Sequence, residues 1–258
     1  MTFLARVGRV VLAFLSATGR LAIFTLTALS HCFRPPIYVN LILRQFVDIG
    51  YYSLPVVGLT AIFIGMVLAL QLHTGFNRIT GGESAIAQVV VLGMTRELGP
   101  VIAGLMVAGR IGAAIAAEVG TMRVTDQIDA LSTLSTNPYK YLVVPRLLAG
   151  IIALPVLVLV ADNIGVFGGF LVATYKFGFN PVAYLQNTAD FLRSEDVISG
   201  LIKSSVFGFL ISLMGCYTGY HSKGGAQGVG AATTYAVVSA SVLILMFDYI
   251  LSALLFSS

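Results

Sequence analysis

The chain is 258 residues long, with 57% hydrophobic and only 10% charged residues, whereas soluble domains carry about 25% charge. This composition excludes a soluble protein and predicts an integral membrane protein. The formal net charge of +4 is too small and too spread out to indicate nucleic-acid binding. Cys32 and Cys216 lie far apart and in no metal-ligand spacing, which predicts two free thiols.

Residues 1–46 are predicted to form an interfacial or elbow region before the membrane bundle. Apolar side chains of residues 1–30 fall mostly on one helical face, and Arg6, Arg9 and Arg20 lie off that face. This pattern indicates an amphipathic helix lying in the membrane interface. The arginines are not clustered before one apolar block, so no cleavable signal peptide is evident.

Apolar stretches of about 20 residues indicate membrane spans. The second and third stretches exceed the thickness of a bilayer, so they must tilt, break or project beyond it. Pro100, Pro145 and Pro155 are the predicted places for bends or helix ends. The five predicted spans are Ser53–Leu72, Ala85–Ala117, Val143–Thr174, Val197–Tyr220 and Val229–Phe256.

The lysines and arginines of the loops predict the orientation of the chain. Five arginines precede the first span, and the loops 118–142 and 221–228 carry further cations. The loops on the other side hold few cations beside several acids. The N-terminus is therefore predicted to be cytosolic, and five spans then place the C-terminus outside.

Charges within the predicted spans are costly, by about 2.5–3.5 kcal/mol each on insertion scales. Arg96 and Glu97 lie 11–12 residues into the second span, about 17 Å from its outer end. Adjacent residues point about 100° apart on a helix, so the two cannot face the same partner squarely. Either they form a structural ion pair with another helix, or they line a polar site for a substrate headgroup.

Lys203 and Asp248 form a second candidate pair. Rise per residue puts them about 9 and 12 Å from the outer ends of the fourth and fifth spans. This similar depth predicts a buried, mainly structural bridge between adjacent helices. Asp162, near the outer end of the third span, is predicted to be interfacial.

Small residues recur every four positions in several predicted spans, a spacing that lets membrane helices approach closely. Either packing within the chain or a homodimer interface explains such seams. The seams are Ala108-Gly112-Ala116-Gly120, Gly109-Ala113-Ala117, Gly165-xxx-Gly169 and Gly215-xxx-Gly219.

The predicted cytosolic loop between spans two and three, residues 118–137, contains a short amphipathic helix. Val124, Ile128, Leu131 and Leu134 share one helical face, and Thr125 or Asp126 can cap its start. The opposite face offers acidic and amide side chains. Such a helix either docks a motor domain or rests on the membrane surface.

Several chemistries lack their motifs in this sequence. There is no GxxxxGK[ST] phosphate loop, no HExxH and no GxSxG, and the three histidines are scattered. No catalytic residues, no metal site and no cofactor are therefore predicted for this chain. Energy for transport would come from a partner subunit or an ion gradient.

Four phrases resemble MlaE-type permeases, the membrane subunits of MCE-associated ABC transporters. They are FIGMVLALQ (63–71), RELGPV (96–101), AGRIGAAIAAEVGTMRVTDQIDAL (108–131) and SSVFG (204–208). The resemblance covers nearly the whole chain and implies a single permease domain over residues 1–258. It also implies an all-α fold, with an interfacial helix, a transmembrane bundle over 53–256 and a cytosolic coupling helix within 118–137.

The resemblance further implies the partners. Members form homodimers and bind two cytosolic ABC ATPase subunits, which hold ATP and Mg. A hexameric periplasmic MCE-domain protein sits on the outer side, and some systems add a STAS-domain accessory protein. The substrate class is phospholipid, moved between the inner and outer membranes.

Residue roles also follow from the resemblance. Arg96 and Glu97 are expected near the lipid cavity, with Leu68, Leu72 and Phe76 of the first span as acyl-chain contacts. Lys203 and Asp248 match a charge pair of the last two spans. The coupling residues expected to face the ATPase are Glu118, Gly120, Thr121, Arg123, Asp126, Gln127 and Asp129.

The resulting prediction is a permease subunit of a phospholipid ABC transporter in the bacterial inner membrane, contributing to outer-membrane lipid asymmetry. It is a transport subunit rather than an enzyme. The first alternative is a secondary transporter of an amphipathic substrate, driven by protons through Glu97, Lys203 and Asp248. Five spans without inverted repeats argue against it. The second alternative, an intramembrane lipid enzyme, lacks a nucleophile–base pair.

Overall fold

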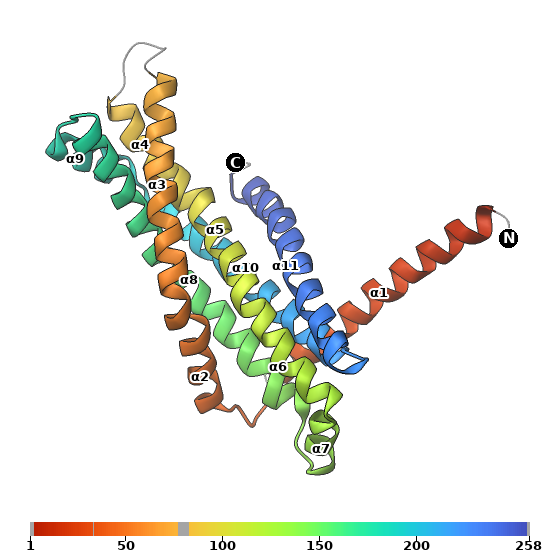
Figure 1. Ribbon diagram of the computed structural model, residues 1–258. Helices are drawn as coiled ribbons and strands as arrows, with labels where there is room; N and C mark the ends of the chain where they lie inside the picture. Colours follow the sequence, from red (N-terminus) through yellow and green to blue (C-terminus); the bar gives the residue numbers. More distant parts are fainter. Residues whose placement is uncertain (1–2, 33, 77–82, 257–258) are drawn as a thin grey trace.

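Every regular element in the described part of the chain is a helix, and one helix stands apart from an elongated bundle (Figure 1). The computed structural model describes residues 3–32, 34–76 and 83–256. The prediction of an all-α membrane protein is confirmed, because six helical segments of this part are long and apolar enough to cross a membrane. They are Gly8–Cys32, Val39–Gly75, Ser84–Val124, Tyr139–Lys176, Ser194–Tyr220 and Gly225–Phe256.

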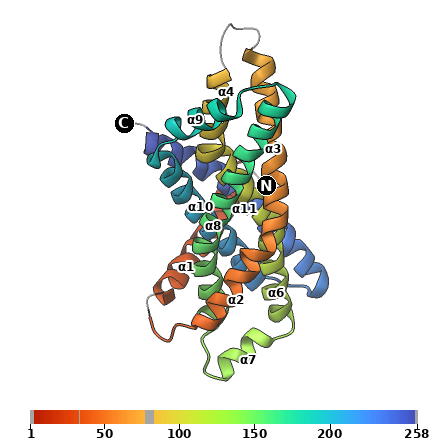
Figure 2. The same cartoon turned by 90° about the vertical axis from the view of Figure 1, so that its left-hand side faces the viewer.

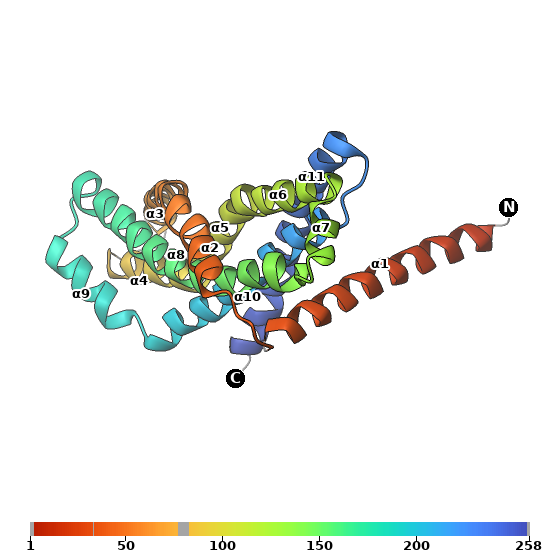
Figure 3. The ribbon, with the colours of Figure 1, turned by 90° about the horizontal axis from the view of Figure 1, so that it is seen from below.

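The separate helix is α1 (Phe3–Cys32), which extends away from the other helices in the view from below (Figure 3). Only its C-terminal part is anchored, through the buried side chains of Phe24 and Ala28. By length and composition α1 is one of the six candidate spans. The interfacial position expected from its arginines stays a prediction.

Aromatic rings hold the end of α1 against the bundle. The Phe24 ring lies 5.3 Å from the ring of Tyr139 and 5.4 Å from that of Tyr217, measured between centroids. Beyond α1, the Lys140 ammonium donates a 2.6 Å hydrogen bond to the carbonyl oxygen of Pro35. Clustered tyrosines of this kind are typical of a membrane–water interface.

The first span of the bundle is interrupted near its start. α2 (Val39–Ile49) ends at Gly50, the short 3₁₀ turn η1 (Tyr51–Ser53) follows, and α3 (Leu54–Phe76) continues the path. Gly50 is the C-cap of α2, and its N–H donates to the carbonyl of Phe46 at 2.8 Å. The sequence predicted a span over 53–72, so the helical path is longer than predicted at both ends.

The second span contains two π-helical turns, which interrupt an otherwise α-helical path. Pro100 lies in the first turn of the helix that follows the first π turn. The predicted span 85–117 is longer than a bilayer is thick, and these two π turns are local interruptions of its helix. The elements are α4 (Glu83–Gly93), η2 (Met94–Leu98), α5 (Gly99–Val107), η3 (Ala108–Gly112) and α6 (Ala113–Val124).

The third span also carries a π turn at each end. Pro145 lies in the first turn of its central helix, while Pro155 lies inside that helix without ending it. The elements are η4 (Tyr139–Val143), α8 (Val144–Leu171) and η5 (Val172–Lys176). α8 is largely buried, as is α10, and packs on α2, α3 and α10.

The last two spans are the long helices α10 (Ser194–Tyr220) and α11 (Gly225–Phe256). A helix that the sequence reading missed, α9 (Pro181–Phe191), precedes them. Asn180 caps it, because its side-chain oxygen accepts the N–H groups of Val182 and Ala183 at 3.0 and 3.2 Å. The sequence signal was present as Asn180-Pro181, a cap followed by proline at the first helical position.

Close helix contacts occur where small residues face each other. A β-carbon at Gly65 would collide with the backbone of Gly165, and one at Gly208 would collide with the carbonyl of Gly150. These positions join α3 to α8 and α8 to α10. A β-carbon at Gly109 meets nothing within 4 Å. No other helix of the described chain therefore packs closely against Gly109 of the predicted seam Gly109-Ala113-Ala117.

The bundle has two distinct ends, which Figure 2 shows from the side. The short helix α7 (Gln127–Thr133) lies at one end, beyond α6. α4 and α9 lie at the opposite end. α6 of the second span and η4 with α8 of the third span connect α7 to the rest of the bundle.

Candidate functional site

The first π turn of span two, η2, carries the two charges that the sequence singled out. Arg96 and Glu97 are adjacent in this turn and meet different partners. Arg96 contacts Asp196, whereas Glu97 contacts Lys203. The geometry agrees with the argument that adjacent helical residues cannot face one partner.

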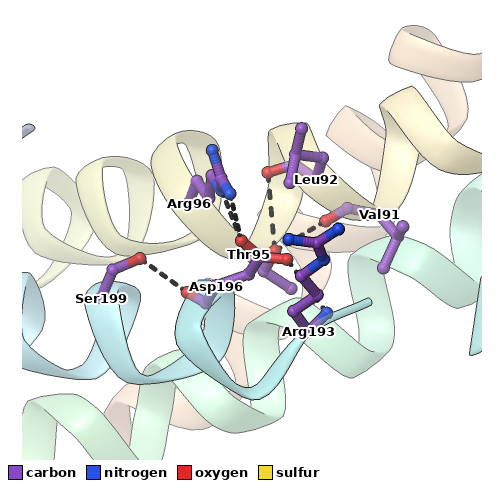
Figure 4. Close-up of polar contacts among 7 residues, drawn as sticks. All are labelled: Val91, Leu92, Thr95, Arg96, Arg193, Asp196 and Ser199. Carbon is purple, nitrogen blue, oxygen red and sulfur yellow. Dashed lines mark hydrogen bonds and ion pairs between the residues drawn. The ribbon is translucent and has the colours of Figure 1, made fainter. Parts of the chain in front are cut away.

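Arg96 is held by a buried carboxylate at the start of α10. Its Nη2 and Nε lie 2.5 and 2.6 Å from Oδ1 of Asp196, whose side chain is 2% exposed. The other carboxylate oxygen of Asp196 accepts the N–H of Arg193 at 3.0 Å. Figure 4 shows Arg96 reaching across from span two to Asp196. Asp196 is thus fixed both to its own helix and to Arg96.

Lys203 of α10 is completely buried and neutralises two carboxylates. Its Nζ lies 2.8 Å from Oε2 of Glu97 and 3.1 Å from Oδ1 of Asp248. The same ammonium donates to the carbonyl oxygen of Arg96 at 2.9 Å. Ser252 adds a 3.1 Å hydrogen bond to Oε1 of Glu97. A buried cation needs such partners, because desolvation of an isolated charge is very costly.

These residues form one network, which we call the central ion cluster. The sequence predicted the pair Lys203–Asp248 and treated Arg96–Glu97 separately, whereas the structure joins both. Within this cluster Arg96 is the more accessible cation, with a side chain that is 32% exposed. The members of the central ion cluster are Arg96, Glu97, Asp196, Lys203 and Asp248.

A pocket of about 570 Å³ lies beside Arg96 between α10 and α11. The guanidinium of Arg96 stands 4.3 Å from the centre of the Phe256 ring, on the pocket wall. Apolar side chains form part of the remaining wall. The lining residues are Arg96, Glu195, Ile198, Ser199, Ile202, Leu255 and Phe256. A cation in a pocket whose wall is part apolar and part polar is suited to an amphipathic ligand with an anionic group.

The predicted acyl-chain contacts on α3 lie elsewhere in a single copy. Leu68 and Leu72 are partly buried against a second hydrophobic cluster that includes Val90 and Tyr184. They do not line the pocket beside Arg96. The side chain of Phe76 lies outside the described residues. The lipid role of these three residues stays a prediction.

Asp162 is buried inside the protein, and its expected position near the membrane interface stays a prediction. Asp162 lies within α8 and is 7% exposed. A β-carbon at Gly99 would collide with its Oδ1, and this oxygen has no hydrogen-bond partner among the residues that the structure describes.

The predicted coupling helix is divided into two elements. α6 ends at Val124, Asp126 adopts a left-handed conformation with φ of 58°, and α7 begins at Gln127. Asp126 occupies the N-cap position of α7 but makes no side-chain capping bond. Ile128 of the predicted apolar face is buried, whereas Leu134 is 75% exposed because α7 already ends at Thr133.

Most predicted coupling residues lie on the surface at this end. Thr121, Asp126, Gln127 and Asp129 are exposed, and Arg123 reaches Asp129 at 2.7 Å.

Glu118 and Gly120 occupy different surroundings at this end. Glu118 forms an ion pair with the buried Arg146 at 2.8 Å. Gly120 is buried against Ser222 and Val229, so its contribution is to helix packing and not to a partner surface.

Sequence reasoning missed another intramembrane arginine. Arg110 lies in the second π turn, η3, and its Nη1 donates to Ser53 Oγ at 2.8 Å and to the carbonyl oxygen of Asp48 at 3.3 Å. The sequence reading assigned this stretch to a seam of small residues. A cation within an apolar helix was the signal that would have found it.

Comparison with known proteins places the chain among permeases. A family model described as Permease MlaE matches residues 42–254. The chain is 57% identical over 250 residues to a probable ABC transporter permease protein of Rickettsia felis, covering 97% of this chain and 96% of the relative. It is 34% identical over 263 residues to the intermembrane phospholipid transport system permease protein MlaE of Haemophilus influenzae, covering 100% and 99%.

A plant relative is also similar over much of the chain. The protein TRIGALACTOSYLDIACYLGLYCEROL 1, chloroplastic, of Arabidopsis thaliana is 40% identical over 214 residues. That similarity covers 83% of this chain and 61% of the plant protein.

Proposed function

The chain belongs to the MlaE permease family, and on that premise we propose that it moves phospholipid between the inner membrane and a periplasmic MCE-domain protein. It is the membrane subunit of an ABC transporter in this proposal. Its α7 end faces the cytosol, and it contributes to the lipid asymmetry of the outer membrane. The Haemophilus influenzae relative, named for intermembrane phospholipid transport, supports this substrate class.

The observation that carries the proposal is the position of Arg96. Its guanidinium is anchored by Asp196 yet remains one-third exposed beside a pocket whose wall also carries apolar side chains, Ser199 and Glu195. A phospholipid has a phosphate that meets Arg96 and acyl chains that meet Ile198, Ile202 and Phe256. Arginine is suited to this role because its planar fork binds phosphate oxygens and it stays charged.

Lys203 has a different role from Arg96 in this proposal. Its ammonium is already shared by Glu97, Asp248 and a backbone carbonyl. It therefore fixes α10, α11 and η2 relative to one another, and Arg96 is the cation that contacts the lipid.

Two copies of the chain and two ATPase subunits complete the proposed machine. The ATPases bind ATP and Mg and dock on the exposed residues around α7. A periplasmic hexameric MCE-domain protein receives or delivers the lipid, with a STAS-domain protein as an accessory. The unfilled surface at Gly109 and the exposed face of α11 leave apolar area for a second copy.

A first experiment purifies the complex gently and identifies its proteins and bound lipid by mass spectrometry. Co-purification of an ATPase, an MCE-domain protein and phospholipid is the expected result. A lone chain whose transport follows a pH gradient without ATP would instead support a proton-coupled secondary transporter.

A second experiment tests Arg96 itself by lipid transfer between reconstituted complexes and acceptor vesicles. Arg96→Ala removes the phosphate contact, and we expect transfer to fall about tenfold or more, as for loss of a hydrogen bond to a charged group. Arg96→Lys should retain an intermediate rate, because it keeps the charge but not the fork.

The matched control is Lys176→Gln, which removes an exposed cation outside the pocket lining. Its transfer rate should equal that of wild type. An assembled Arg96→Ala complex with wild-type transfer would overturn the proposed headgroup contact.

A further inference from the structure

Arg110 bridges two interruptions of the helical bundle that are far apart in the sequence. It belongs to the π turn η3 of span two, and its two acceptors flank Gly50 in span one. Asp48 lies in the last turn of α2, before the break, and Ser53 ends the 3₁₀ turn η1, after it. One guanidinium thus holds both sides of the break.

The chemistry of this contact suits the end of a helix. The last carbonyls of α2 have no partner within their own helix, and they form the negative end of its dipole. Arg110 brings a positive charge to that end. The Ser53 side chain is nearly completely buried, so its hydroxyl has little access to water and depends on Arg110.

The two groups that accept hydrogen bonds from Arg110 carry no charge. Among residues 3–32, 34–76 and 83–256, Arg110 makes no ion pair with a carboxylate. An arginine bound only to a carbonyl and a hydroxyl is held less strongly than one bound to a carboxylate. This link can therefore lengthen or exchange partners without breaking a salt bridge.

Arg110 lies on the part of span two that leads to α6 and α7. Arg110 lies 14 residues before the end of α6 at Val124, about 21 Å at helical rise. α6 leads directly to α7 at the end of the bundle. π-Helical turns occur frequently at functional sites, and η3 lies between this end and the central ion cluster.

We propose that Arg110 is a positioning residue that makes the angle between α2 and α3 follow the movement of span two. A displacement of α6 and α7 moves η3, and Arg110 transmits that movement to both sides of the break at Gly50. α3 then shifts relative to α8, along which it packs. This inference rests on the proposed transport function and adds a mechanical connection to it.

The test compares Arg110→Gln, Arg110→Lys and Ser53→Ala in the assembled complex. ATP hydrolysis and lipid transfer are measured separately on each. We expect Arg110→Gln to keep ATP hydrolysis within about twofold of wild type and to lower lipid transferred per ATP about tenfold, as for a lost charged hydrogen bond. Arg110→Lys keeps the charge but has a shorter side chain than the arginine whose Nη1 contacts both acceptors, and Ser53→Ala removes one acceptor. Lipid transferred per ATP in both variants should fall between the values of Arg110→Gln and wild type.

The matched control is Arg20→Gln, which removes an exposed arginine hydrogen-bonded to Ser16 of its own helix at 2.6 Å. Both of its rates should equal those of wild type. A drop of hydrolysis and transfer in equal proportion in Arg110→Gln would indicate a structural role and overturn the proposal.

Hydrogen–deuterium exchange measures the movement directly. In wild type, a non-hydrolysable ATP analogue should change exchange both in residues 113–133 and in residues 45–60. In Arg110→Gln it should still change exchange in 113–133 but no longer in 45–60. An equal response of 45–60 in this variant would overturn the proposal.

The two proposals fail in different ways. Wild-type transfer per ATP in Arg110→Gln, with transfer lost in Arg96→Ala, overturns the role of Arg110 and leaves the transport function intact. If the wild-type complex moves no lipid, the transport function fails, and the exchange response of residues 45–60 still decides the mechanical connection.

Discussion

The two π turns of span two have the same backbone form but opposite chemistry. At η2, Arg96 and Glu97 meet Asp196 and Lys203 through full charges. At η3, Arg110 meets only a carbonyl and a hydroxyl. The decisive partners are equally buried, because Asp196 and Ser53 are both 1% exposed.

The difference therefore lies in charge and not in burial. Breaking a buried ion pair leaves an uncompensated charge and is strongly destabilising. Losing a neutral acceptor costs much less. η2 thus fixes the helices around the pocket, while η3 provides a connection that can rearrange during a transport cycle.

The largest effect is expected from a substitution that removes the ion pairs at η2. Lys203→Met leaves Glu97 and Asp248 without their shared cation. We expect a loss of about 2–4 kcal/mol in unfolding free energy, less than for a fully buried pair because Glu97 is partly exposed. Denaturant titration of the detergent-solubilised protein, followed by circular dichroism, measures this loss of unfolding free energy.

The control for Lys203→Met also replaces the two carboxylates that Lys203 contacts by neutral side chains. Adding Glu97→Gln and Asp248→Asn should restore most of the stability, because no carboxylate then lacks a cation. A Lys203→Met variant as stable as wild type would contradict the structural role of the central ion cluster.

Substituting alanine for one glycine at each π turn compares how tightly the two turns are packed. Gly99 follows η2, and a β-carbon there would collide with Asp162 and with the Met94 carbonyl. Gly109 lies in η3 and has open space around it. Gly99→Ala should cost about 1–3 kcal/mol by overpacking, whereas Gly109→Ala should gain up to about 1 kcal/mol from helix propensity.

Thermal unfolding of both glycine variants in the same detergent measures the difference. Equal stability of the two variants would contradict the difference in packing. A loss at Gly109 in the assembled complex, absent from the single chain, would indicate that a second copy packs against η3.

Arithmetic along single helices predicted much of the fold and part of the site. Hydropathy located the helices of the bundle, and equal depth paired Lys203 with Asp248, which are in contact. Such reasoning works because rise per residue is fixed once a helix is assumed. It placed Arg96 and Glu97 at different partners for the same reason.

What the sequence left out depends on contacts between distant segments. Asp196 was counted as a loop charge because its partner Arg96 lies 100 residues away. Arg110 was absorbed into a pattern of small residues, although its acceptors belong to another helix. The division between α6 and α7 depends on the left-handed Asp126, a conformation that asparagine or glycine signals more clearly than aspartate does.

The smallest effects are expected from deleting one serine hydroxyl that contacts a charged residue of each π turn. Ser53→Ala removes the shorter of the two Arg110 contacts, so we expect a loss of about 1–1.5 kcal/mol. Ser252→Ala removes a hydrogen bond from Glu97, which keeps Lys203 and is partly exposed, so about 0.5 kcal/mol or less is expected. Chemical denaturation of both variants in one detergent measures the order. If Ser252→Ala were the more damaging change, the hydroxyl at η2 would matter more than the ion pair beside it, and the contrast between the two turns would not hold.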